Sequence, residues 1–147
     1  THLLHAAVLK ILGPHAVQKG SNITPERLRF DFAHGEKLTD EQKTAVEHLV
    51  NAAIQRDYQV SFQIIPLEEA KKKQAIGLFG EKYEAMVKVY TVGDPDGLPD
   101  ADPSASTFSR EFCGGPHVEH TGVLGKFKIT KEEAVSAGIR RIRAVFE

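Results

Sequence analysis

Short segments with strand-like patterns are the feature that most limits how this chain can fold. Apolar and polar residues alternate in segments 28–32, 60–64 and 126–129, while 85–92 and 139–146 are rich in β-branched residues. Parallel strands need crossover connections of about a dozen residues or more, and few of the links are that long. The pattern therefore predicts an α+β chain, with helices packed on a mainly antiparallel β-sheet.

Two segments have the spacing of amphipathic helices. Apolar residues recur at helical intervals in the opening segment, which Gly13-Pro14 ends at residue 12. Thr39 followed by Gln42 is a capping box in front of an apolar stripe that continues to residue 54. Further expected elements are a strand over 17–22, a short helix over 67–74, an extended segment over 108–112 and a helical turn over 131–136.

The composition favours a single globular domain. The chain has 147 residues, of which 41% are hydrophobic and 27% charged. Its one cysteine, Cys113, excludes an intrachain disulfide and favours a reducing compartment, so we expect a cytoplasmic protein. No apolar run approaches the about 20 residues of a membrane span, and no membrane partner is expected. Because the sequence starts at Thr1 inside a helical pattern and without Met, we expect it to be part of a longer protein.

Charge is distributed unevenly along the chain. Segment 93–107 holds four aspartates as its only charged residues, together with three prolines, and is expected to be an exposed acidic loop. Segment 124–147 holds six basic and three acidic residues. Within it Arg141 and Arg143 share one face of the expected last strand. These basic residues can face phosphates, but on charge alone an ordinary solvated surface is the more common explanation.

Cys113 and His117 form a pair that can bind metal. They flank two glycines and Pro116, and glycines let the backbone turn so that both side chains point to one place. Thiolate and imidazole are good ligands for Zn²⁺, and His2 and His5 can share one face of the first helix. The alternative is a single buried cysteine that packs as a small hydrophobic residue. A catalytic Cys–His pair is also conceivable, but no orienting third group is evident.

Several segments together resemble a known family. They occur in the order found in the editing domain of alanyl-tRNA synthetases, a domain type that is also found free-standing and has a relative in threonyl-tRNA synthetases. The resemblance runs nearly from end to end, with 93–107 as a local insertion. The matching segments are 2–7, 18–21, 28–32, 75–83, 113–117, 121–122 and 137–142.

The resemblance implies an editing hydrolase in one domain over residues 1–147. Such a domain cleaves the ester of Ser-tRNA(Ala) or Gly-tRNA(Ala), because a pocket for alanine cannot strongly reject glycine or serine by binding alone. The parent synthetase attaches alanine to tRNA(Ala) using ATP and Mg²⁺. Two alternatives remain open, namely a non-catalytic zinc-stapled tRNA-binding module and a free-standing deacylase.

The resemblance also implies roles for individual residues. His2, Cys113 and His117 match zinc ligands, and the fourth family histidine would lie upstream of Thr1, so zinc should bind more weakly here than where that histidine is present, with water or His5 in the fourth place. Four protein ligands would form a closed set, which favours a zinc that shapes the pocket over one that activates water. Gln18 matches a residue that lines the amino-acid pocket and positions substrate or water.

The same resemblance bears on three arginines near the end of the chain and on Pro116. Arg140, Arg141 and Arg143 are candidates for contacts to the tRNA backbone. Pro116 stands where the family usually has threonine, and proline removes both a hydroxyl and a backbone N–H from the motif. This substitution is the reason for keeping the non-catalytic alternative.

Overall fold

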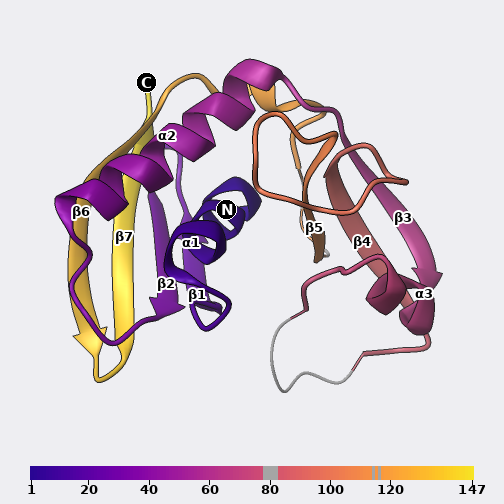
Figure 1. Ribbon diagram of the computed structural model, residues 1–147, viewed down its shortest axis with the longest axis horizontal. Helices are drawn as coiled ribbons and strands as arrows, with labels where there is room; N and C mark the ends of the chain where they lie inside the picture. The colour runs from indigo at the N-terminus through magenta and orange to yellow at the C-terminus, as the bar shows by residue number, and fades with distance from the viewer. Residues whose placement is uncertain (78–82, 114, 116) are drawn as a thin grey trace. The chain divides into compact units, whose positions relative to one another are not determined.

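The computed structural model describes residues 1–77, 83–113, 115 and 117–147. The chain divides into two compact units, each of which is described by itself (Figure 1). The first unit comprises Thr1, Leu3–Ala52 and Leu124–Glu147, and the second comprises His2 and Ala53–Val123.

The first unit is built on a four-stranded antiparallel sheet in the order β1-β2-β7-β6. Its strands are β1 (Gln18–Ile23), β2 (Leu28–Ala33), β6 (Phe127–Ser136) and β7 (Ile139–Phe146). The register places Phe30 opposite Ile142, and both side chains are buried. The alternation in β2 thus predicts the covered face correctly.

Two helices pack on that face. In α1 (His2–Leu12) the buried ring of His5 contacts Phe30, with ring centroids 5.5 Å apart. In α2 (Asp40–Arg56) the Asn51 amide bonds to both the N–H and the carbonyl of Phe127. The capping box is confirmed: the Gln42 N–H donates to the Thr39 hydroxyl at 3.1 Å, and the Thr39 N–H donates to the Gln42 amide at 2.9 Å.

The second unit contains a three-stranded antiparallel sheet in the order β3-β4-β5. Its elements are β3 (Val60–Pro66), α3 (Leu67–Lys72), β4 (Met86–Gly93) and β5 (Thr107–Phe112), with a short 3₁₀ helix η1 (Thr121–Leu124) at the boundary. A hydrophobic cluster covers one face of this sheet. Its buried members are Ile65, Ala70, Val87 and Val89, against which Leu67, Ala75, Tyr83 and Phe112 pack.

The opposite face, called the open face below, is exposed only in part, because Tyr90 and Glu111 on it are buried. Its cross-strand pairs are Phe62 with Tyr90, Ile64 with Lys88 and Pro66 with Met86. Phe62, Ile64 and Met86 are 53%, 61% and 50% exposed. The alternation in β3 is therefore correct as a strand pattern, but its large apolar residues lie on the open side.

The acidic segment between β4 and β5 has no regular secondary structure, as predicted. Hydrogen bonds hold it against the rest of the second unit. The Tyr58 hydroxyl donates to the Ala105 carbonyl at 2.7 Å. The buried Arg110 guanidinium donates to the carbonyls of Lys73 and Pro95, and burial lowers the pKa of Arg110. Asp94, Asp96 and Asp100 are exposed, so the loop combines a solvated acidic edge with a fixed backbone.

Gln18 is the first residue of β1, in the region where a strand over 17–22 was predicted. Two expectations need correction. Residues 131–136 form no helical turn; they continue β6, which pairs with β7 across a tight turn where Gly138 adopts a φ of 74°. There are two antiparallel sheets where one was expected, because Ala53–Val123 forms a core of its own.

Candidate metal centre

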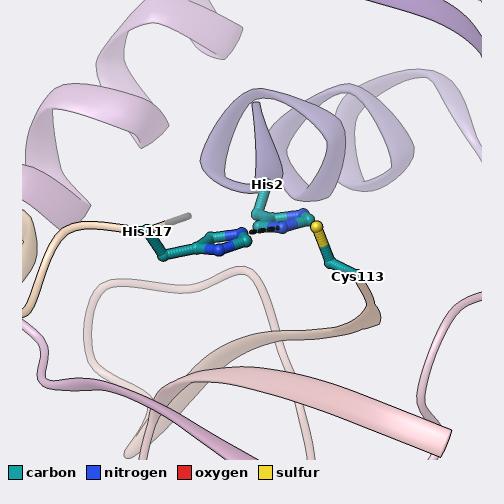
Figure 2. Close-up of side chains that lie close together, drawn as sticks. All are labelled: His2, Cys113 and His117. Atoms are coloured by element: carbon teal, nitrogen blue, oxygen red, sulfur yellow. Dashed lines mark hydrogen bonds between the residues drawn. The ribbon is translucent and has the colours of Figure 1, made fainter. Parts of the chain in front are cut away.

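His2, Cys113 and His117 converge within the second unit. One ligand atom from each residue, an imidazole nitrogen or the thiol sulfur, lies within 4.8 Å of the others, and all three residues are partly buried. Figure 2 shows the two imidazole rings side by side with the Cys113 sulfur next to His2. The prediction that His2 meets the Cys113–His117 pair is thus confirmed as geometry.

Local backbone contacts hold the Cys113–His117 pair in place. Cys113 follows β5, and its N–H donates to the Lys88 carbonyl of β4 at 3.2 Å. His117 Nδ1–H donates to the Gly115 carbonyl at 2.8 Å. Because Nδ1 carries this hydrogen, Nε2 of His117 is left with its lone pair.

A carboxylate fixes the ring of His2 in the same way. His2 is the first residue of α1, and its Nδ1–H donates to Oε2 of Glu111 at 2.9 Å. Glu111 lies on β5, two residues before Cys113, and is buried. A histidine that donates one N–H to a carboxylate and presents the other nitrogen is the usual arrangement of a metal-binding imidazole.

The two Nε2 atoms of His2 and His117 lie 2.5 Å apart. Since each ring donates from Nδ1, the two lone pairs face each other, and this is favourable only with a cation or a proton between them. Burial, reinforced by the neighbouring His2, lowers the pKa of His117 to about 4. A proton is therefore disfavoured there at neutral pH, which leaves a metal cation as the better partner.

Ring stacking completes the support of His117. The Tyr90 ring stacks on His117 with centroids 3.7 Å apart, while the ring of His2 lies edge to edge with that of His117, nearly in one plane and with centroids 4.6 Å apart. Sequence reasoning missed both Tyr90 and Glu111. For Glu111 a signal was available in the two-residue period of a strand, since Glu111 and Cys113 are two residues apart and so share one face of an extended segment.

The donor set fits zinc. Two imidazole nitrogens and one thiolate are preferred Zn²⁺ ligands, and soft sulfur disfavours Mg²⁺ or Ca²⁺. The residues that would hold the ion are His2, Cys113 and His117. His5 is engaged elsewhere, because its Nε2 accepts the backbone N–H of Gln18 at 3.3 Å in the first unit.

Gln18 belongs to the first unit and is half-buried at the start of β1. Its side-chain amide donates to the Ser21 hydroxyl at 3.2 Å. The strand register shifts between Gln18 and Gly20, so a bulge marks the position. The role of Gln18 toward a substrate stays a prediction.

The three candidate tRNA-binding arginines have carboxylate partners in the first unit. Arg140 lies on the helix-covered face and pairs with Glu132 at 2.5 Å. Arg141 and Arg143 share the opposite face, as predicted, where Arg141 bonds twice to Asp31 at 2.8 and 3.0 Å and Arg143 pairs with Glu133 at 3.0 Å. Their contact with tRNA stays a prediction.

Some predicted features lie outside the described residues. These are Pro116, Gly114 and the central part of the 75–83 motif, residues 78–82. Within the described ranges, no helix is both long and apolar enough to cross a membrane.

Comparison with known proteins gives matches along the whole chain. Residues 87–143 match the family described as the threonyl and alanyl tRNA synthetase second additional domain. The chain is 57% identical over 147 residues to an alanine–tRNA ligase of Treponema denticola and 52% identical over 147 residues to one of Treponema pallidum. It is 52% identical over 145 residues to an alanine–tRNA ligase of Shewanella amazonensis. These matches cover 100%, 100% and 99% of the chain but only 22%, 22% and 15% of the relatives.

Proposed function

Residues 87–143 belong to the family of the second additional domain of threonyl and alanyl tRNA synthetases, and the whole chain is similar to alanine–tRNA ligases; on that premise we propose that the chain is an editing deacylase. Its substrates are Ser-tRNA(Ala) and Gly-tRNA(Ala), and the reaction is hydrolysis of the ester between the amino acid and the tRNA 3′ end. The two compact units act together as one editing domain in this proposal.

The convergence of His2, Cys113 and His117 carries the proposal. His2 lies far from Cys113 and His117 in the sequence, yet the ligand atoms of the three residues meet within 4.8 Å. Each imidazole is held by an acceptor at Nδ1, so both rings present Nε2 to one point. Bound there, Zn²⁺ supplies a positive charge that organises the pocket and can polarise an oxygen atom.

The chain's own residues have separate tasks in this proposal. Glu111 keeps the Nδ1 proton of His2 in place and so keeps its Nε2 available as a ligand. Gln18 presents an amide that both donates and accepts, and it holds the substrate carbonyl, the amino group or a water molecule. Arg141 and Arg143 contact the tRNA backbone from the open face of the first sheet, with Arg140 behind them on the covered face.

The proposal extends to the longer protein. The parent is a synthetase that attaches alanine to tRNA(Ala) with ATP and Mg²⁺ in the cytoplasm, and the editing chain receives the acceptor end of the mischarged tRNA. This extension rests on relatives of which the chain spans about a fifth or less.

A deacylation assay tests the proposal. The chain is incubated with Ser-tRNA(Ala), Gly-tRNA(Ala) and Ala-tRNA(Ala), and release of the amino acid is followed over time. We expect release of serine or glycine, little release of alanine, and loss of release in Cys113→Ala.

A different result would favour the non-catalytic module. Pro116, which replaces the family threonine, is the observation that favours this alternative. Tight binding of Ser-tRNA(Ala) without any release of serine would select the module and contradict the deacylase.

A further inference from the structure

The open face of the second unit's sheet carries an apolar strip, made of Phe62 and Ile64 on β3 and Met86 on β4. All three side chains are at least half exposed. They lie on neighbouring strands in antiparallel register, since Phe62 pairs with Tyr90 and Ile64 with Lys88. Side chains in such register form one continuous surface.

A positive charge lies on this apolar strip. Nζ of Lys88 is 4.4 Å from the ring centroid of Phe62 and 5.3 Å from that of Tyr90. Within the described part of the chain, this ammonium group makes no ion pair. An ammonium group over aromatic faces, with no carboxylate to neutralise it, is available to an anionic ligand.

The apolar strip is continuous with the candidate metal centre. The Tyr90 ring contacts Phe62 on one side, with centroids 5.6 Å apart, and stacks on His117 on the other. The carbonyl of Lys88 accepts the N–H of Cys113, so the lysine and the metal-binding cysteine are neighbours across two strands. A ligand whose reactive group reaches the metal centre would extend directly onto the apolar strip.

We propose that the apolar strip, with Lys88, binds the unpaired 3′-terminal nucleotides of the tRNA acceptor end. This inference rests on the proposed function, which places the ester at the metal centre. The ester joins the amino acid to the last ribose, so the last bases must lie close to that centre. Unpaired bases stack on exposed aromatic side chains, and a lysine beside such a side chain can bind the phosphate that joins two nucleotides.

The size and charge of the apolar strip argue against a protein partner. A specific protein interface buries about 800 Å² on each side, which corresponds to about 20–30 residues. The apolar strip has three large apolar side chains, and its centre holds a lysine, whereas the centres of protein interfaces are depleted of charged residues. One exposed aromatic ring with a cation over it, flanked by aliphatic side chains, suits a short single strand better.

Binding of a short single-stranded RNA ending in CCA tests the inference. Its affinity for the chain is measured by fluorescence anisotropy at several salt concentrations. We expect Phe62→Ala to weaken binding about tenfold, the loss expected for one base stack. Lys88→Ala should weaken binding and make it less dependent on salt, and Lys88→Arg should restore both properties.

The control is Ile23→Ala, which removes an equally exposed apolar side chain from β1 of the first unit; Ile23 is 63% exposed. It should bind the RNA as the unchanged chain does. Circular dichroism and thermal melting confirm that each variant is folded. The inference is overturned if Phe62→Ala and Lys88→Ala bind the RNA normally, or if Phe62→Ala changes only self-association in sedimentation experiments.

The same variants separate this inference from the proposed function. In the deacylation assay we expect Phe62→Ala to raise KM for Ser-tRNA(Ala) and to leave kcat nearly unchanged. If serine is released normally by both variants, the apolar strip is excluded as a binding surface while the deacylase stands. If the unchanged chain binds the RNA through Phe62 but releases no serine, the binding surface stands while the deacylase is excluded.

Discussion

The two antiparallel sheets of this chain each have one covered face and one open face, and the open faces differ in chemistry. In the first unit the open face carries arginines that are paired with acids, such as Arg141 with Asp31. In the second unit the open face carries exposed apolar side chains and Lys88, which lies over aromatic rings. The first surface thus pairs Arg141 and Arg143 with acids of the same sheet, while on the second surface the apolar side chains stay exposed and Lys88 makes no ion pair among the described residues.

This difference bears on where a ligand would bind. An arginine that already bonds a carboxylate must share or exchange that partner to contact a phosphate, so part of the binding energy is offset. Within the part of the chain that the structure describes, Lys88 lies over aromatic rings and has no carboxylate to exchange. The open face of the second sheet, which also reaches the candidate metal centre, therefore offers a cation that an anionic ligand can approach without displacing an acid.

The largest effect is expected from Cys113→Ala. Loss of the thiolate removes one of three protein ligands, so the chain should no longer retain zinc, and deacylation should be lost with it. Metal analysis after gel filtration and the serine-release assay measure both effects. Hydrogen exchange should show lost protection in the second unit and unchanged protection in β1 and β2. Full zinc retention in this variant would refute the ligand assignment.

Glu111→Gln should weaken zinc binding about 10–100-fold, as loss of a carboxylate partner to a metal-binding histidine typically does. The amide oxygen can still accept the His2 N–H, but it carries no charge. Competition with a chelator measures the affinity, and the absorption spectrum of a Co²⁺-loaded sample reports the ligand geometry. Glu119→Gln, which changes an exposed acid in the same unit, is the control. Equal affinities in both variants would show that Glu111 has no part in the site.

Glu132→Gln should destabilise the first unit by about 2 kcal/mol, because it leaves the Arg140 guanidinium, on the covered face, without its carboxylate. Glu133→Gln removes the partly exposed partner of Arg143 and should cost less than Glu132→Gln, because solvent screens this pair. Urea denaturation of the two variants at pH 7 measures the difference. Similar values would mean that the covered and open faces of this sheet do not differ energetically.

The same pair of variants has an expected pH dependence. The Glu132 carboxyl is buried, which by itself would raise its pKa, but hydrogen bonds from Arg140 and Leu38 lower the pKa below its usual value of 4.5. The stabilisation is therefore complete above pH 4.5 and is lost as the pH falls through the lowered pKa. Denaturation curves should show the wild type and Glu132→Gln converging in acid.

The smallest effect is expected from Gln18→Ala. Loss of one positioned hydrogen bond should slow deacylation on the order of tenfold, equivalent to about 1.4 kcal/mol. The melting temperature should hardly change, since substitution of a surface polar residue usually alters stability by less than about 0.5 kcal/mol. Ser21→Ala removes the local partner of the amide and serves as the control. Unreduced deacylation in Gln18→Ala would exclude Gln18 from the site.

Local elements were predictable because their signals are local. The capping box at Thr39 and Gln42 specifies where α2 begins, and alternation specifies β2 and its buried face. Residues 131–136 show the limit: their polar composition suggests a helical turn, yet pairing with β7 holds them extended. Cross-strand hydrogen bonds outweighed the weak local preference.

The candidate site was predictable only in part. The metal-binding chemistry of His2, Cys113 and His117 and the family resemblance come from the sequence itself. Their meeting in space, and the support from Glu111 and Tyr90, depend on how β4 and β5 pair and where α1 begins. Periodicity indicates which residues share a face of one segment, but it carries no information about which segment lies opposite.

The sequence by itself thus determined the element types, the α+β class and the residues able to bind a metal. The tertiary structure decided which faces are covered, that Arg141 faces Asp31, and that Tyr90 lies between the apolar strip and His117. The physical reason is that backbone propensities and capping act over a few residues, whereas burial and ion pairing depend on strand register between segments far apart in the chain.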